Sequence, residues 1–141
     1  MRKTILLIML CIILAVSAAA CQNSAQEDSI NITNVQMTTE LDSNGVPVDS
    51  VTSYSTDAEK FIITATVNNA PDDTVIIFLW KQESTILYKS DELDVSNTNE
   101  YNVYAALTND QVWDEGDYSV EIYVDDNAEP FQTVDFTVNA N

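Results

Sequence analysis

The side chains that could do chemistry in this sequence are almost all carboxylates. The chain of 141 residues has 23 Asp and Glu, only five Lys and Arg, and no histidine. Arg2 is its one arginine, and its two cysteines are Cys11 and Cys21. Catalytic sites of the Ser-His-Asp and Cys-His kinds, and metal sites with histidine ligands, are therefore excluded.

A pair of carboxylates acting as acid and base would still permit a hydrolase of the glycosidase kind. Such a pair needs one carboxyl group that is partly buried, so that its pKa is raised. Nearly every Asp and Glu here falls in a predicted loop or on the polar side of a predicted strand. We therefore expect no enzyme, and a carboxylate-based hydrolase remains a remote alternative.

The amino-terminal residues have the pattern of an export signal. Two basic residues precede an apolar run from Ile5 to Val16, and small residues then lead to Cys21. Because the run is too short to cross a bilayer comfortably, we predict a helical signal peptide over residues 1–20 that is cleaved. The mature protein would then lie at the cell membrane or the cell surface.

Two kinds of cleavage remain open before Cys21. The run Ala18, Ala19, Ala20, Cys21 is similar to the bacterial lipobox, in which the cysteine is lipid-modified and becomes the new amino terminus. Ala18 stands where that pattern usually has a larger aliphatic residue. The same alanines satisfy the A-x-A pattern of ordinary signal peptidase. We favour lipidation at Cys21, because this cysteine would otherwise be a lone thiol on an exported protein.

Cleavage of the leader would leave a strongly acidic chain without a cysteine pair. Three lysines would face 23 acidic residues, a net charge of −20, so we expect no nucleic-acid partner. Cys11 would be lost with the leader, which rules out an internal disulfide, so the fold must rely on apolar burial and strand pairing. The polar residues 21–29 are expected to form a flexible, lipid-anchored tether.

From residue 30 onward the sequence predicts an all-β domain over residues 30–139. Apolar and polar residues alternate in short runs, with no helical period, which favours an antiparallel β-sandwich of seven to eight strands. A bulge is expected near Thr33 and Asn34, where the apolar side of the run changes, and a turn at Asn44 and Gly45. The expected strands lie within residues 30–41, 46–54, 61–67, 74–82, 86–88, 101–107, 118–124 and 134–138.

The stretch 113–124, WDEGDYSVEIYV, predicts the corner around which the domain is organised. Gly116 can take a positive φ, and Tyr118 just after it can bury its ring while its hydroxyl reaches back to an upstream carbonyl. This is the arrangement of a tyrosine corner, although an ordinary buried tyrosine at a strand start fits the same spacing. Trp113 opens the stretch, and Trp80 is expected to pack across from the Tyr118 strand.

Residues 60–138 resemble the immunoglobulin-like and fibronectin type III-like modules of prokaryotic surface lipoproteins. The likeness rests on Trp80, on the corner at Gly116, Asp117 and Tyr118, and on the closing strand FQTVDFTV. It implies a single antiparallel immunoglobulin-like β-sandwich. The disulfide pair of antibody domains is missing, so the likeness implies architecture and nothing about antigen-type binding.

In an immunoglobulin-type topology, two of the acidic loops would emerge at the same end of the sandwich. Calcium favours several carboxylate and carbonyl oxygens from neighbouring loops, so it is a possible cofactor, and no other cofactor is expected. Against calcium, the sequence has no EF-hand loop, and acidic loops are usual on so negative a surface. The candidate ligands are Asp72, Asp73, Asp125, Asp126 and Glu129.

Apolar residues on the outward side of one strand give the most useful prediction about function. The inward side of strand 74–82 is expected to carry Phe78 and Trp80, so its remaining apolar residues face outward. Such a stripe would be a partner site if it is exposed. Alternatively, strand 86–88 or the amino-terminal segment covers it. The candidate partner residues are Val75, Ile77, Leu79 and Tyr123.

Together these patterns predict a non-enzymatic binding or interaction module of the cell envelope. It would be attached to the membrane through lipid at Cys21 and would bind a possible envelope protein partner. A calcium-binding or purely structural surface domain is the alternative.

Overall fold

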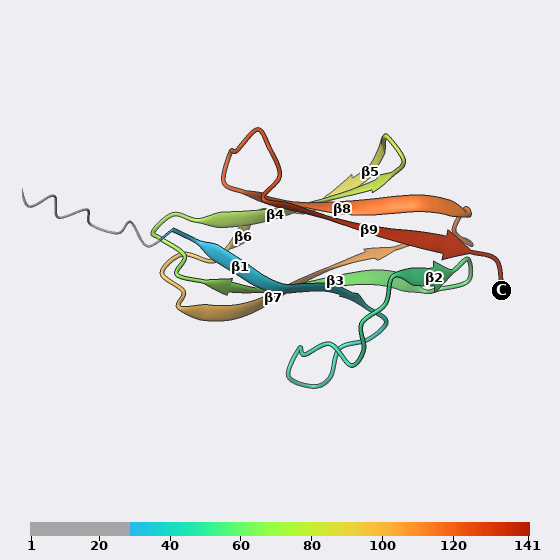
Figure 1. The fold of residues 1–141 in the computed structure, drawn as a ribbon, viewed down its shortest axis with the longest axis horizontal. Helices are drawn as coiled ribbons and strands as arrows, with labels where there is room; N and C mark the ends of the chain where they lie inside the picture. Colours follow the sequence, from blue (N-terminus) through green and yellow to red (C-terminus); the bar gives the residue numbers. More distant parts are fainter. Residues whose placement is uncertain (1–28) are drawn as a thin grey trace, which may run out of the picture.

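Two β-sheets packed face to face make up residues 29–141, which are the residues that this computed structural model describes (Figure 1). The expectations for the leader 1–20, for Cys21 and for the tether up to residue 28 lie outside the described residues. Residues 29–141 contain no helix, and so none that could cross a membrane. The expected all-β class is confirmed.

The smaller sheet has three antiparallel strands in the order β1-β3-β7. The larger sheet has the order β2-β9-β8-β4-β5, with the short β6 also paired with β4. All of its pairs are antiparallel except β2 with β9, which is parallel. The strands are β1 (Asn31–Thr38), β2 (Ser53–Ser55), β3 (Lys60–Asn68), β4 (Val75–Gln82), β5 (Thr85–Lys89), β6 (Leu93–Asp94), β7 (Glu100–Thr108), β8 (Gly116–Val124) and β9 (Gln132–Asn139).

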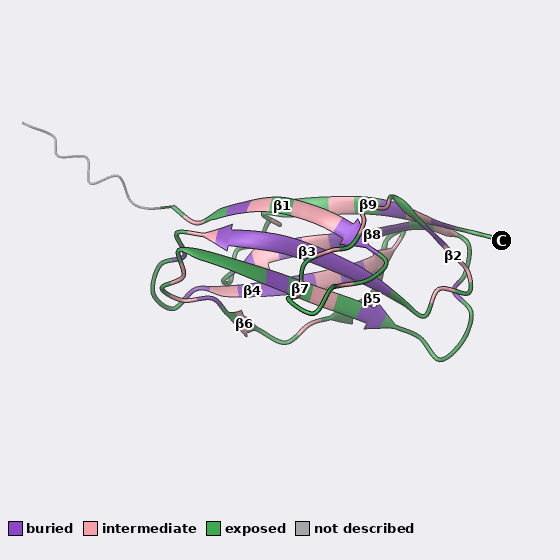
Figure 2. Cartoon of the chain, turned by 90° about the horizontal axis from the view of Figure 1, so that it is seen from below, coloured by how far each residue is buried: buried purple, intermediate pink, exposed green. Residues whose placement is uncertain are grey.

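Alternation along the strands decides which side chains enter the core. In β8 the residues Tyr118, Val120 and Ile122 are buried while the residues between them are partly exposed. Strand β3 is different, because its outer side is also buried along most of its length (Figure 2). The long connection after β1 lies on that outer side, where its residues 45–47 line a hollow together with residues 64–66 of β3 (Figure 1).

Aromatic rings join the two sheets at one end of the core. Phe61 of β3 is fully buried, and its ring centroid lies 4.1 Å from that of Trp113 and 5.0 Å from that of Phe136. The rings of Tyr54 and Tyr118 lie at 4.8 and 5.5 Å from it. These five residues, here called the aromatic junction, come from both sheets and from the loop before β8. Their packing ties the sheets together at this end.

The predicted corner is present at the start of β8. Gly116 has φ +144°, Tyr118 is buried, and its hydroxyl donates a hydrogen bond of 2.8 Å to the carbonyl of Asp114. Trp113 is held as well, because its Nε1 donates to the Ala58 carbonyl at 2.7 Å. Burial and the charge of Asp114 raise the pKa of the Tyr118 hydroxyl, so it remains a donor at neutral pH.

The structure agrees in part with three expectations, which concern a bulge, one strand and the number of strands. The bulge near Thr33 and Asn34 is confirmed by the break in the β1 to β3 register and by the positive φ of Asn34. The expected strand 46–54 is wrong over most of its length, because only isolated bridges at Pro47 and Val51 precede the three-residue β2. Proline lacks the N–H that a continuous ladder needs. With the short strands β2 and β6 included, residues 29–141 form nine strands instead of seven to eight.

The expected position of Trp80 was also wrong. It is buried on β4 and pairs with Val120 of β8, so the two strands are neighbours in one sheet and do not face each other across the core. The ring packs instead near Phe136, at 6.3 Å between centroids. Among the described residues, Trp80 Nε1 is the buried side-chain polar atom that has no hydrogen-bond partner.

A carboxylate holds the long connection between β1 and β2 in place. Asp49 Oδ1 accepts from the Thr38 hydroxyl at 2.6 Å and from the Thr39 amide at 2.8 Å, and Oδ2 accepts from the Thr39 hydroxyl at 2.6 Å. These hydrogen bonds, led by that from Thr38, keep the pKa of Asp49 below its usual value. The Tyr54 hydroxyl donates to the Thr38 carbonyl nearby at 2.6 Å.

Replacing Tyr118 by Phe should destabilise the domain by about 1 kcal/mol, because the Asp114 carbonyl loses its donor while the ring stays in the core. Urea denaturation of the full chain would measure the change. Tyr104→Phe is the matched control, since Tyr104 is 58% exposed on β7. Equal stabilities of the two variants would contradict the structural role of the corner.

The Asp49→Asn variant should change how the free energy of unfolding depends on pH. A carboxyl whose folded pKa is lowered contributes stability above its unfolded pKa of about 3.9, and loses that contribution as pH falls through the folded pKa. The difference in unfolding free energy between wild type and Asp49→Asn should therefore be constant from neutral pH to about pH 5 and shrink at lower pH. Urea titrations at a series of pH values test this. A difference that stays constant at all acid pH values would refute the role of the Asp49 carboxylate in holding the connection between β1 and β2.

Candidate binding site

A groove lies on the outer face of the larger sheet. Its floor is the outward side of β4 and β8, where Ile77 pairs with Tyr123 across the two strands and Leu79 follows on β4. The β4–β5 hairpin and the β8–β9 turn both project from this face, one at each end of the floor (Figure 1). The groove has a volume of about 360 Å³. This is a plausible size for one or two side chains of a partner.

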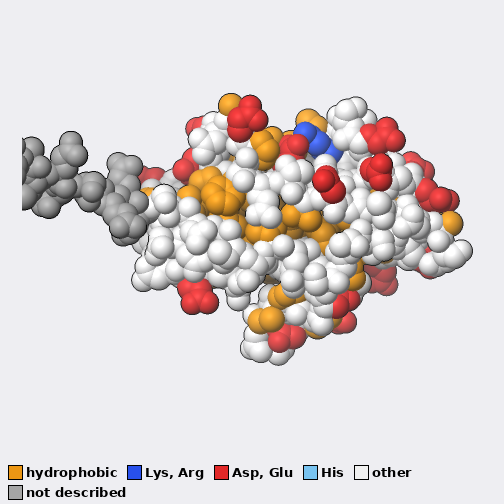
Figure 3. Space-filling model, viewed as in Figure 1, with side chains coloured by type: hydrophobic (Ala, Val, Ile, Leu, Met, Phe, Trp, Pro, Cys, Tyr) orange, Lys and Arg blue, Asp and Glu red, His pale blue; other side chains and the backbone are white. Residues whose placement is uncertain are grey.

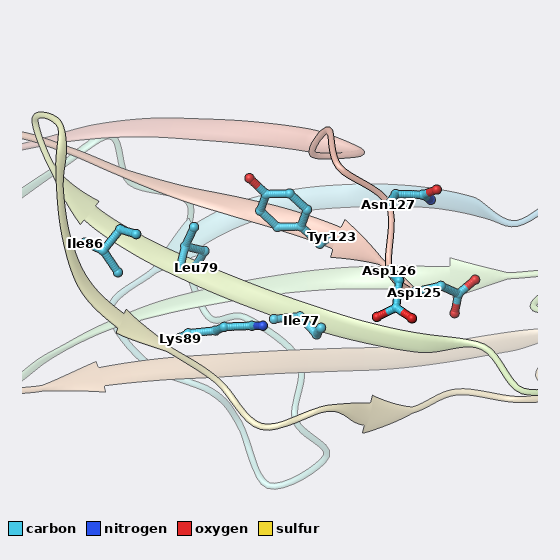
Figure 4. A pocket seen from close by; sticks show the side chains of 8 residues that line it. All are labelled: Ile77, Leu79, Ile86, Lys89, Tyr123, Asp125, Asp126 and Asn127. Carbon is cyan, nitrogen blue, oxygen red and sulfur yellow. The ribbon is translucent and has the colours of Figure 1, made fainter.

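The walls of the groove differ in chemistry (Figure 4). One wall is formed by β5, which contributes Ile86 and Lys89. The other is the turn after β8, which contributes Asp125, Asp126 and Asn127. An apolar floor between a strand and an acidic turn can accept an apolar side chain whose neighbours are polar or basic.

An ion pair lies next to the floor on the same face of the sheet. Glu121 lies next to Leu79 in the register, and its Oε1 accepts from Lys81 Nζ at 2.6 Å. Its Oε2 accepts from the Tyr123 hydroxyl at 2.8 Å. Burial works to raise the pKa of Glu121, but the hydrogen bonds from Lys81 and Tyr123 outweigh it and the pKa is lowered. The donation to Glu121, partial burial, and the charges of Glu121 and Glu129 raise the pKa of Tyr123.

The geometry fixes the tyrosine at the edge of the groove. Since Tyr123 stays protonated and donates to Glu121, its ring is held beside Leu79 and Ile77. Lys81 is used in the ion pair, so Lys89 is the lysine that lines the groove. A fixed aromatic ring next to aliphatic side chains is a typical anchor for a partner residue.

The groove contains three of the four predicted partner residues. Ile77, Leu79 and Tyr123 come together in the groove, while Val75 is half-buried on β4 and does not line it. Ile77 is only 5% exposed, whereas Leu79 and Tyr123 are half-buried. Strand β5 bounds the stripe without burying it, since all five β5 residues are themselves exposed.

Sequence reasoning missed the contribution of β5 to the site. Ile86, Leu87 and Tyr88 are 60%, 40% and 47% exposed, which is unusual for three large apolar residues in succession. The signal was present in the sequence as TILYK, an apolar run without alternation in a strand too short to be a central one. The run was interpreted as a possible cover for the stripe and not as a surface in its own right.

The two loops that carry the five predicted calcium ligands lie next to each other. The two loops do adjoin, because Asp125 Oδ1 accepts from the Val75 amide at 2.9 Å and the Asp125 amide donates to the Val75 carbonyl. That contact ties the carboxylate of Asp125 to backbone. Within residues 29–141 no group of three or more His, Cys, Asp or Glu side chains is arranged to hold a metal ion.

The carboxyl groups whose pKa departs from its ordinary value all shift in one direction. The pKa is lowered for each described carboxyl group that departs from its ordinary value, namely Asp42, Asp49, Asp57, Asp94 and Glu121. Hydrogen bonds from nearby donors are the cause that lowers each of them. A carboxylate hydrolase needs the opposite, a carboxyl group whose pKa is raised.

Comparison with known proteins extends the description of the fold only. No protein-family model matches the chain, and no curated protein matches it. Among solved structures it is similar to the immunoglobulin-like protein PA1606 from Pseudomonas aeruginosa, with a TM-score of 0.57 and 11% identity over 79% of this chain and 97% of that one. The expected immunoglobulin-like sandwich is thereby confirmed.

A second similar structure is the alkylpurine DNA glycosylase AlkC of Pseudomonas fluorescens, bound to DNA with an abasic site analog. Its TM-score is 0.54 and its identity 13%, over 79% of this chain. This chain spans only 30% of the length of that enzyme. At these identities both likenesses show the fold alone, an immunoglobulin-like β-sandwich.

Proposed function

We propose that this chain is a non-catalytic binding module of the cell envelope and that it holds a protein partner in the groove on the outer face of β4 and β8. The observation that carries the proposal is the apolar groove, in which the half-buried Leu79 and Tyr123 flank the buried Ile77 and lie beside β5, all of whose residues are exposed. A monomeric β-sandwich has no packing reason to leave three large apolar β5 side chains exposed beside such a groove, as they are within residues 29–141. The immunoglobulin-like fold supports a binding or structural role without naming a ligand.

The envelope location is part of the same proposal. Its support is the amino-terminal sequence, in which a short apolar run and small residues precede Cys21. Lipid at Cys21 would attach the chain to the membrane, and the polar residues after it would let the sandwich face its partner. The acidic surface suits an exported protein that must remain soluble outside the cytoplasm.

Photo-crosslinking in the native host tests the proposal at the groove. A photoreactive amino acid at position 86 of the full chain should give a discrete adduct with a second protein, because Ile86 lies on the wall of the groove. Leu79→Lys should abolish the adduct, since it puts a charge on the apolar floor. The same photoreactive residue at position 112 is the matched control, because Val112 is 71% exposed and does not line the groove.

The folding of the variants must be checked in the same experiment. Leu79→Lys should change the free energy of unfolding by no more than about 1 kcal/mol, because the side chain faces outward. The adjacent Phe78→Lys, which buries a charge in the core, should not fold. Unfolding by Leu79→Lys would show that the stripe is core. An adduct equally strong from positions 86 and 112 would contradict the proposed site.

A further inference from the structure

Strand β5 is an edge strand with one side free for pairing. In the larger sheet β5 pairs with β4 alone, and β4 is paired with β8 on its other side. A row of backbone N–H and C=O groups on the outer edge of β5 therefore has no strand partner in the described part of the chain. Edge strands of monomeric proteins are usually protected by shortness, by a β-bulge, by proline, by several charged side chains, or by a covering loop. Of these devices β5 has a length of only five residues and a bulge at Leu87, which leaves Thr85 and Ile86 on one side of it and Tyr88 and Lys89 on the other. Residues Thr85–Lys89 have no proline and one charged side chain, at the end of the strand.

A bulge turns β5 toward the groove. Tyr88 pairs with Trp80 and Ile86 pairs with Lys81, so Leu87 is an extra residue between the two pairs. In a regular ladder without the bulge, Leu87 and not Ile86 would stand opposite Lys81. The bulge therefore places Ile86 on the same side as Lys89, which is the outward side that lines the groove. The hairpin also rises from the sheet there (Figure 1).

Charge indicates what kind of segment fits this edge. Glu83 precedes β5, and Asp91 and Glu92 follow it, while Asp125 and Asp126 stand on the opposite wall. Residues 29–141 contain 21 acidic residues and three lysines. Figure 3 shows acidic side chains scattered over one face, with lysine visible at a single place. This charge repels a second copy of the chain and attracts a basic segment.

We propose that the partner of this module contributes an extended segment, apolar at alternate residues and flanked by Lys or Arg, which adds as a strand to the free edge of β5. The inference rests on the proposed function. Backbone hydrogen bonds to β5 would supply affinity, and the side chains on the same side as Ile86 would enter the groove over Leu79 and Ile77. The basic flanks would lie against Glu83 at one end and against Asp91 and Glu92 at the other.

Synthetic peptides test this mode of binding on the purified full chain. The probe is a short peptide of alternating valine and threonine with two lysines at each end. We expect it to bind and to slow amide hydrogen exchange in Thr85–Lys89. The same peptide with glutamate at the ends should bind at least about tenfold more weakly. Ile86→Lys should weaken the lysine peptide by a similar factor, while Val112→Lys should leave its affinity unchanged.

Backbone methylation separates strand addition from side-chain binding. Two versions of the lysine peptide are methylated at alternate amides, one on each side of the extended chain. One version should lose at least about tenfold in affinity and the other should bind normally, because only one side of an added strand donates to β5. Equal binding by the two versions, or equal binding by the lysine and glutamate peptides, would overturn the inference.

Three further results would distinguish failure of strand addition from failure of the proposed function. If no peptide binds while the adduct at position 86 persists and depends on Leu79, strand addition is wrong and the proposed function stands. If that adduct is missing, the proposed function itself fails. A dimer in sedimentation analysis whose β5 amides are already protected without peptide would show that a second copy occupies the edge, which also overturns the inference.

Discussion

The two sheets of this domain depend on the aromatic junction at one end of the core. Residues 29–141 contain no cysteine, so packing must do what a disulfide does in antibody domains. Phe61 enters from the smaller sheet and meets rings from β2, β8, β9 and the loop before β8. Each such ring pair adds to the stability given by burial of apolar area. The corner at Tyr118 fixes where one of those rings stands.

The core packing between the two inner faces holds the sheets together, so the outer face of the larger sheet is free for another role. The buried side of β4 supplies Ile76, Phe78 and Trp80 to the core, so Ile77 and Leu79 between them are not needed to hold the sheets together. The outer side of β3, by contrast, is covered by the connection that Asp49 holds. The two sheets thus differ: the smaller one has the outer side of its central strand β3 buried, and the larger one keeps an apolar groove beside an edge that is unpaired in the described part of the chain.

The sequence predicted what depends on local pattern and missed what depends on pairing partners. Alternation placed the main strands, and the spacing of Gly116 and Tyr118 predicted the corner, because both are set within a few residues. The position of Trp80 in the same sheet as Tyr118 depends on strand order, which no local pattern carries. For the site, the alternation of side-chain direction along strand 74–82 predicted the outward apolar stripe. The groove also needs the bulge in β5 that turns Ile86 outward. The calcium ligands were chosen from charge and from the end of the sandwich that their two loops share in an immunoglobulin-type topology, and neither reveals that Asp125 accepts a hydrogen bond from the Val75 amide.

The central claim is that ring packing around Phe61 replaces a disulfide in holding the sheets together. The free energy of unfolding of the full-chain Phe61→Ala variant in urea tests it most directly. The account predicts a loss of about 3–5 kcal/mol, because a fully buried ring is removed and a cavity is left. The control Tyr101→Ala removes a ring that is 50% exposed and should cost less than about 1 kcal/mol. Equal losses from the two variants would contradict the claim.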